Sequence, residues 1–146
     1  MVMPSPINEP SPSKFSDPAE FSINSAKVKV LSLIDKFPHH LILGADTIVV
    51  YENRIMGKPG SITESEEMIR CLSGKTHWVI TGLCLVVPGE SIRLHSETTE
   101  VTFRKLSDAE IDWYVASGDG MDKAGAYGIQ SLAGCLVTSI NGDWFN

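Results

Sequence analysis

The run LILGADTIVVY, residues 41–51, most constrains how this chain can fold, because it is apolar and β-branched yet has a carboxylate at its centre. A short apolar run of this kind predicts a largely buried strand. Asp46 inside that strand must be paired, protonated or metal-bound to offset its desolvation. The small residues Gly44 and Ala45 would let another backbone or a ligand approach closely. In a purely structural alternative, Asp46 lies at the strand end and caps a turn or bonds Thr47.

Apolar periodicity and capping patterns predict helices in three parts of the chain. Apolar residues recur at roughly helical spacing after Asp17. Two further apolar faces each follow a Ser/Thr-x-x-Glu pattern, and they end at Gly74 and at Gly118. The two predicted capping boxes are Thr63–Glu66 and Ser107–Glu110.

Further strands are predicted between these helices. Residues 54–57 follow the first strand across a short turn, and residues 76–87 and 92–103 flank a Pro88-Gly89 turn as a hairpin. Asn141-Gly142 has the composition of a hairpin turn leading into another strand. Helices interspersed with strands and hairpins predict an α/β or α+β fold with a mixed sheet.

Composition limits the class of protein. With 146 residues, 42% of them hydrophobic, the chain can bury one ordinary core. A net charge of −6 argues against a nucleic-acid polymer as partner, whereas a small anionic ligand needs only a metal ion and a few local lysines. The proline- and serine-rich residues 1–15 predict a disordered tail ahead of a single domain, 16–146. We expect the three cysteines to be reduced core residues: Cys71, Cys84 and Cys135.

Targeting signals are not evident in the sequence. The N-terminal residues lack the apolar run of a secretory signal, and no stretch reaches eighteen uninterrupted apolar residues. We therefore expect a cytoplasmic protein without a membrane span.

Two later segments combine polar residues with glycines. Lys58 in MGKPG follows Asp46 by about a dozen residues, so the two could face one cleft, although an exposed turn lysine is the simpler alternative. The segment DKAGAYGIQ, residues 122–130, adds Lys123 and Gln130 to residues small enough for close backbone approach. We call it the lysine loop. It suits nucleotide recognition, but a glycine-rich connection whose tyrosine merely packs has the same composition.

In chain order, GADTIVV, GKP, LSGKTHWVITG, TEVTFRKLSDAEIDWYVASGDGMDKAGAYGIQ and SINGDW resemble the motifs of the Maf family of nucleoside-triphosphate pyrophosphatases, over roughly residues 17–145. The resemblance implies a two-lobed α/β fold similar to inosine-triphosphate pyrophosphatases, with a curved mixed sheet flanked by helices and a nucleotide cleft. It also implies a homodimer. The implied reaction cleaves a nucleoside triphosphate between its α and β phosphates with a divalent metal, usually Mg²⁺, to clear non-standard nucleotides.

The resemblance also implies roles for individual residues. Asp46 matches the family's general base or metal-associated carboxylate, and Lys58 matches the lysine after the second strand. Lys29 best matches the family's lysine in the first helix, and Lys27 is the alternative. Cations and an oriented water are what attack on an anionic phosphorus requires.

Other matched positions concern the base and the lysine loop. Thr47 and Gln130 match positions linked to base selection, and the motifs resemble the dTTP/UTP subgroup more than the subgroup acting on 7-methyl-GTP. Lys123 matches a position where a charge near the phosphates and a structural pair with Asp122 are both plausible.

The sequence departs from the family pattern in one functional motif. The family's S-x-S-x-R-R phosphate loop has no counterpart before Asp17, and both ends of the chain look shortened. Two missing guanidiniums would remove bonds worth about 1.5–3 kcal/mol each. The expected function is a pyrophosphatase, and the alternative is a catalytically silent nucleotide-binding or dimerisation module.

Overall fold

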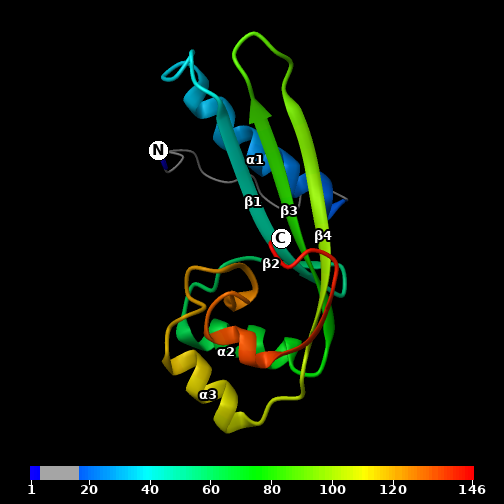
Figure 1. Ribbon diagram of the computed structural model, residues 1–146. Coiled ribbons are helices and arrows are strands. Elements are labelled where there is room, and N and C mark those ends of the chain that lie inside the picture. The colour runs from blue at the N-terminus through cyan, green and yellow to red at the C-terminus, as the bar shows by residue number, and fades with distance from the viewer. Residues whose placement is uncertain (4–16) are drawn as a thin grey trace. The chain divides into compact units, whose positions relative to one another are not determined.

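A computed structural model of the chain describes residues 1–3 and 17–146 (Figure 1). The predicted tail, residues 1–15, lies outside the described residues except for its first three. The elements, in chain order, are α1 (Pro18–Ile34), β1 (Ile42–Tyr51), β2 (Arg54–Met56), α2 (Ile62–Leu72), β3 (Thr76–Val86), β4 (Arg93–Phe103), α3 (Asp108–Ala116), the 3₁₀ helices η2 (Ala124–Ala126) and η3 (Leu132–Leu136), and β5 (Val137–Asn141).

The strands of the described residues form one sheet in the order β2-β1-β3-β4-β5. This confirms the α/β class, but neighbouring strands run antiparallel where we expected a mixed sheet. Short turns account for the β1–β2 and β3–β4 pairs, because a tight turn can join only antiparallel neighbours. Glu52 and Asn53, between β1 and β2, have φ angles of 48° and 60°, as a two-residue hairpin of type I′ requires.

Contacts divide the chain into two compact units, as expected for a two-lobed fold. The first unit consists of residues 1–47 and 80–97, and the second of residues 48–79 and 98–146.

In the first unit, α1 packs against the strands through an apolar face (Figure 1). The helix begins where Asp17 accepts a hydrogen bond of 3.0 Å from the Ala19 amide, with Pro18 in the first helical turn. Its core contacts are made by Ala26, Val30 and Cys84, with Ile34, Ile42 and Val86 packed against them.

Two glycines bring α1 directly onto the strands. A Cβ on Gly82 of β3 would lie 2.2 Å from the carbonyl carbon of Ser22, and one on Gly44 of β1 would lie 2.4 Å from Cγ2 of Val30. Neither position has room for a side chain. The helix backbone therefore lies in contact with β3, and its side chains lie in contact with β1.

In the second unit, α2 begins two residues earlier than predicted. Ser61 is the N-cap, and its hydroxyl accepts a 3.1 Å hydrogen bond from the Glu64 amide. The predicted Thr63–Glu66 capping box is therefore wrong. Ser61-x-x-Glu64 has the same spacing, and the Glu64 carboxylate is already bound to the Gly60 amide at 2.7 Å, which fixes the earlier start.

The third helix has the predicted capping box. Ser107 accepts from the Glu110 amide, and the Glu110 carboxylate accepts from the Ser107 amide at 2.8 Å. Hydrogen bonds from Ser107 and then from Arg104 lower the pKa of Glu110 to about 2. The predicted apolar face is buried at Ile111, Tyr114 and Val115.

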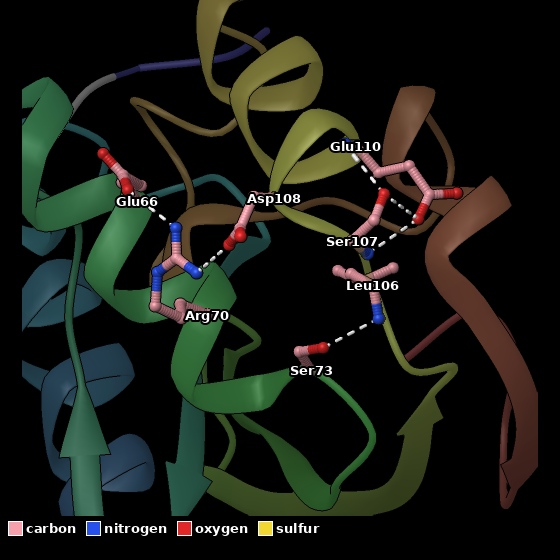
Figure 2. A network of polar contacts seen from close by, with 7 residues as sticks. All are labelled: Glu66, Arg70, Ser73, Leu106, Ser107, Asp108 and Glu110. Carbon is pink, nitrogen blue, oxygen red and sulfur yellow. Dashed lines mark hydrogen bonds and ion pairs between the residues drawn. The ribbon is translucent and has the colours of Figure 1, made fainter.

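Polar contacts join α2 to the start of α3 (Figure 2). Arg70 of α2 forms ion pairs with Asp108 and, at 2.9 Å, with Glu66. The Ser73 hydroxyl, just after α2, accepts from the Leu106 amide at 2.8 Å. Apolar side chains of both helices belong to the larger core of the described residues, which also includes Val49, Val101, Phe103 and Leu136.

Two further predictions are corrected. The Asn141-Gly142 turn does not lead into another strand within the described residues, because Gly142, with φ of +132°, turns the chain so that Asp143 and Thr99 exchange hydrogen bonds of 3.0 and 3.1 Å. Cys84 is buried as predicted, but Cys71 and Cys135 are exposed; all three are free thiols.

Candidate active site

Asp46 is held by Lys29 in the first unit. The Lys29 ammonium donates to the Asp46 carboxylate, whose side chain is 8% exposed, against 25% for the lysine. Asp46 shares a face of β1 with Gly44, where α1 makes its close contact, and Lys29 belongs to the same part of that helix. The structure therefore pairs the predicted carboxylate with the predicted helical lysine, and Asp46 lies inside β1, not at its end.

This pair has the properties of a proton-accepting group. A buried carboxylate keeps its charge only where an opposite charge or hydrogen bonds favour the ionised form, and an ammonium provides both. Asp46 is thus suited to accept a proton from water or to hold a cation.

Thr47, the next residue, lies on the other face of β1, since successive strand residues alternate. Its side chain is exposed, and its hydroxyl lies 2.9 Å from that of Thr81 in β3. Asp46 and Thr47 therefore present their side chains to different faces of one strand.

In the second unit, the lysine loop lies against the segment that carries Lys58. The Gly125 amide donates to the Gly57 carbonyl at 2.9 Å. Lys123 forms an ion pair with Asp122 at 2.5 Å, and Lys123 followed by Lys58 lowers the pKa of Asp122. The structure thus pairs Lys123 with Asp122, and Lys58 acts on the same carboxylate electrostatically.

The glycines of the lysine loop allow this close packing. Gly125 has φ of +65°, and a Cβ there would lie 2.9 Å from Val49. A Cβ on Gly128 would lie 3.2 Å from Cε of Lys123, so the lysine stem lies across this glycine. Small residues are needed here because the loop folds back on its own lysine.

Tyr127 anchors the lysine loop in the core. Its hydroxyl lies 2.7 Å from Nε2 of His77, and both rings contact Phe103 edge to face. Burial lowers the pKa of His77 to about 4, so the ring is neutral near pH 7. The loop's tyrosine packs, as the simpler alternative held, and His77 of β3 is its partner.

Gln130 closes the lysine loop with an exposed side chain whose Nε2 donates to the Trp144 carbonyl at 3.3 Å. Sequence reasoning missed a group of polar side chains that contacts the lysine loop next to Gln130. Asp119 and Ser131 lie 2.6 Å apart, oxygen to oxygen, and Tyr114 is buried beside them. Acidic and hydroxyl residues after a helix look like ordinary turn residues, so no local pattern points to Asp119 or Ser131.

The implied divalent metal can be tested against the donors present. In residues 1–3 and 17–146, no three His, Cys, Asp or Glu side chains group as a metal site. Mg²⁺ commonly takes one or two carboxylates and completes its shell with water and substrate phosphates. Asp46, as a single buried carboxylate, fits such a shared site.

The structure is that of an α/β protein with a buried acid–lysine pair in its first unit and a glycine-rich lysine loop in its second. A sequence model described as Maf-like protein matches residues 1–146. The chain belongs to the Maf family.

Curated relatives are close in sequence. A dTTP/UTP pyrophosphatase of Pyrococcus furiosus is 45% identical over 146 residues, which cover 100% of this chain and 76% of the relative. The protein of the same name from Pyrococcus horikoshii is 43% identical over 97% of this chain and 75% of its own length. One from Bacillus cereus is 43% identical over 90% of this chain and 69% of its own length. Within the described residues, no helix has the length and apolar character needed to cross a membrane.

Proposed function

We propose that this chain is a nucleoside-triphosphate pyrophosphatase that hydrolyses dTTP and UTP to the monophosphate and pyrophosphate. The observation that carries the proposal is the Lys29–Asp46 pair, in a chain 45% identical to a dTTP/UTP pyrophosphatase. A buried, ionised carboxylate is the group that water activation requires.

In the reaction, Asp46 accepts a proton from the attacking water, whose oxygen forms the new bond to the α-phosphorus. The bond from that phosphorus to the oxygen bridging to the β-phosphate breaks, and pyrophosphate leaves. Lys29 holds the Asp46 carboxylate in place and favours its ionised form. A divalent cation, held by Asp46 and by phosphate oxygens, would neutralise charge on the triphosphate.

The remaining residues bind substrate. We assign Lys58 and Lys123 to phosphate oxygens, because their ammonium groups are compact point charges and the structure brings both near Asp122. Gln130 is assigned to the base, since it is exposed and offers a hydrogen-bond donor and an acceptor. Thr47 is assigned to the base from the family motifs, although its side chain lies on the face of β1 opposite Asp46.

We further propose that the cation is Mg²⁺ and that the protein acts as a homodimer in the cytoplasm. These proposals rest on the family motifs and on the single-carboxylate character of Asp46.

The test is pyrophosphate release from dTTP, UTP and 7-methyl-GTP with Mg²⁺, with phosphate measured before and after adding an inorganic pyrophosphatase. We expect turnover of dTTP and UTP, and a loss of at least about 100-fold in kcat for Asp46→Asn. Asp35→Asn, an exposed carboxylate at the end of α1, is the control and should keep full activity.

Two results would contradict the proposal. One is a wild-type chain, folded by circular dichroism, that releases no pyrophosphate; if it still bound dTTP, the silent nucleotide-binding alternative would be favoured. The other is an Asp46→Asn variant as active as the wild type.

A further inference from the structure

Behind the lysine loop, the end of α3 carries a polar network that the reaction described above does not use. The Ser117 hydroxyl donates to the Tyr114 carbonyl at 2.5 Å and accepts from the Asp119 amide at 3.2 Å. These bonds complete the last turn of α3 and fix the backbone of Asp119 there.

The Asp119 carboxylate connects α3 to the far end of the lysine loop. Its Oδ2 lies 2.6 Å from the Ser131 hydroxyl, immediately after Gln130. The same hydroxyl lies 2.7 Å from the Gly128 carbonyl, inside the loop. Ser131 therefore joins Asp119 to the backbone beside Gln130. Its single hydroxyl proton is shared between the two acceptors, and the charged carboxylate is the stronger one.

A second contact reaches the middle of the lysine loop through Tyr114. This side chain is fully buried, and its hydroxyl lies 3.4 Å from Oδ2 of Asp119 and 3.2 Å from the Ala126 carbonyl. Burial, and then the Asp119 carboxylate, raise the pKa of Tyr114, so the hydroxyl stays a donor. Asp119 and the Ala126 carbonyl share that donor.

The backbone of the lysine loop needs such support. Ala126 has φ of +61°, in the left-handed region that residues with a side chain rarely adopt. Its carbonyl oxygen would lie 1.8 Å from a Cβ on Gly120, so the loop rests directly on the backbone that follows Asp119. A strained conformation persists only where its surroundings fix it.

From these contacts we propose that Asp119 is a positioning residue, which holds the lysine loop in the conformation that presents Lys123 and Gln130 to substrate. The bonds to Ser131 and Tyr114 carry this role. The inference rests on the proposed function, because it takes the loop to contact the triphosphate and the base.

The kinetic test compares Asp119→Ala with Asp119→Asn, which keeps an acceptor oxygen for both hydroxyls. We expect the alanine variant to raise KM for dTTP about tenfold with a much smaller change in kcat, because misplaced contacts weaken binding. The asparagine variant should restore most of the wild-type KM. Asp112→Ala, an exposed carboxylate of α3, is the matched control and should leave KM unchanged. A merely structural role would lower the folded fraction, and hence the apparent kcat, without moving KM.

Combined substitutions test the route of the effect. In a background that carries both Lys123→Ala and Gln130→Ala, Asp119→Ala should add little to KM, since the contacts that it positions have already been removed. Ser131→Ala removes the connecting hydroxyl and leaves the buried Tyr114 in place. It should also raise KM for dTTP, and it replaces Asp119→Ala in the test if that variant folds poorly.

Hydrogen exchange gives a readout that does not depend on turnover. Amides of residues 123–131 should exchange faster in Asp119→Ala and Ser131→Ala, while amides of β3 keep their wild-type rates. Unchanged exchange in the loop would overturn the proposal, and so would faster exchange with an unchanged KM. A folded wild type without turnover contradicts the proposed function instead, and the exchange rates then still decide whether Asp119 orders the loop.

Discussion

Lys29 lies two positions after Lys27 on α1, and its ammonium donates to Asp46. Lys29→Ala removes that ammonium from a buried carboxylate, so we expect a loss of about 1–3 kcal/mol of unfolding free energy and a larger loss of dTTP turnover. Lys27→Ala is the matched control. Urea unfolding and steady-state kinetics on both variants measure the difference, and equal effects of the two substitutions would remove Lys29 from the site.

Burial of His77 should make the stability of the protein depend on pH. Burial lowers its pKa from 6.5 to about 4 in the folded protein, so between these values the unfolded chain binds a proton that the folded protein does not. Stability should therefore be full above about pH 6.5 and fall towards pH 4, by about 3 kcal/mol from this group. Urea unfolding at pH 7, 5.5 and 4.5 measures the slope.

His77→Gln should flatten that slope, whereas His39→Gln, an exposed histidine, should leave it as it is. A slope unchanged in His77→Gln would assign the pH dependence to other groups. Glu110 titrates lower: its pKa falls from 4.5 to about 2 in the folded protein, so its contribution to stability is present above about pH 4.5 and is lost as the pH falls towards 2.

Sequence reasoning located the groups whose chemistry conflicts with their surroundings. Asp46 stood out because a carboxylate in an apolar strand needs a partner, although the choice of Lys29 over Lys27 came from the family resemblance. Asp119 and Ser131 stood out in no way, because their polar surroundings arise only when residues 12 positions apart meet in the fold. Long-range polar contacts of this kind leave no local pattern.

For whole elements, local rules predicted most of what forms. Helices and strands follow apolar periodicity and capping, and both are short-range. The start of α2 was misplaced because two overlapping patterns, beginning at Ser61 and Thr63, satisfy the same rule. The prediction of a strand after Asn141 was wrong because Gly142 has a φ of +132°, far from the value that a type I′ turn requires.

The close contact between α1 and β3 at Gly82 can be tested by substitution. Gly82→Ala places a methyl group 2.2 Å from the Ser22 backbone, which cannot move without shifting the helix. We expect a loss of about 2–4 kcal/mol in unfolding free energy and a fall in turnover, because Lys29 moves with α1. Gly57→Ala, with nothing within 4 Å of the added carbon, is the control for stability. Wild-type urea unfolding in Gly82→Ala would contradict the close contact.

The net negative charge of the whole molecule repels the negative charge of the proposed substrate. The chain carries 18 acidic and 12 basic side chains, a net charge of −6, and it is proposed to bind a triphosphate that is itself strongly anionic. A few lysines near Asp122 and Asp46 offset this locally, and a divalent cation would have to offset the rest. The described residues group too few ligands to hold such an ion without substrate.

Metal removal should therefore act on substrate binding as well as on turnover. We expect EDTA to abolish pyrophosphate release and Mg²⁺ to restore it, and dTTP to bind at least about tenfold more weakly in EDTA, because phosphate charge is then unscreened. Calorimetric titration with dTTP measures the binding, and Mg²⁺ titrated without nucleotide should give no tight site, since its ligands come partly from the phosphates. Turnover that persists in EDTA would assign the charge neutralisation to lysines alone, and tight Mg²⁺ binding without nucleotide would contradict a site shared with substrate.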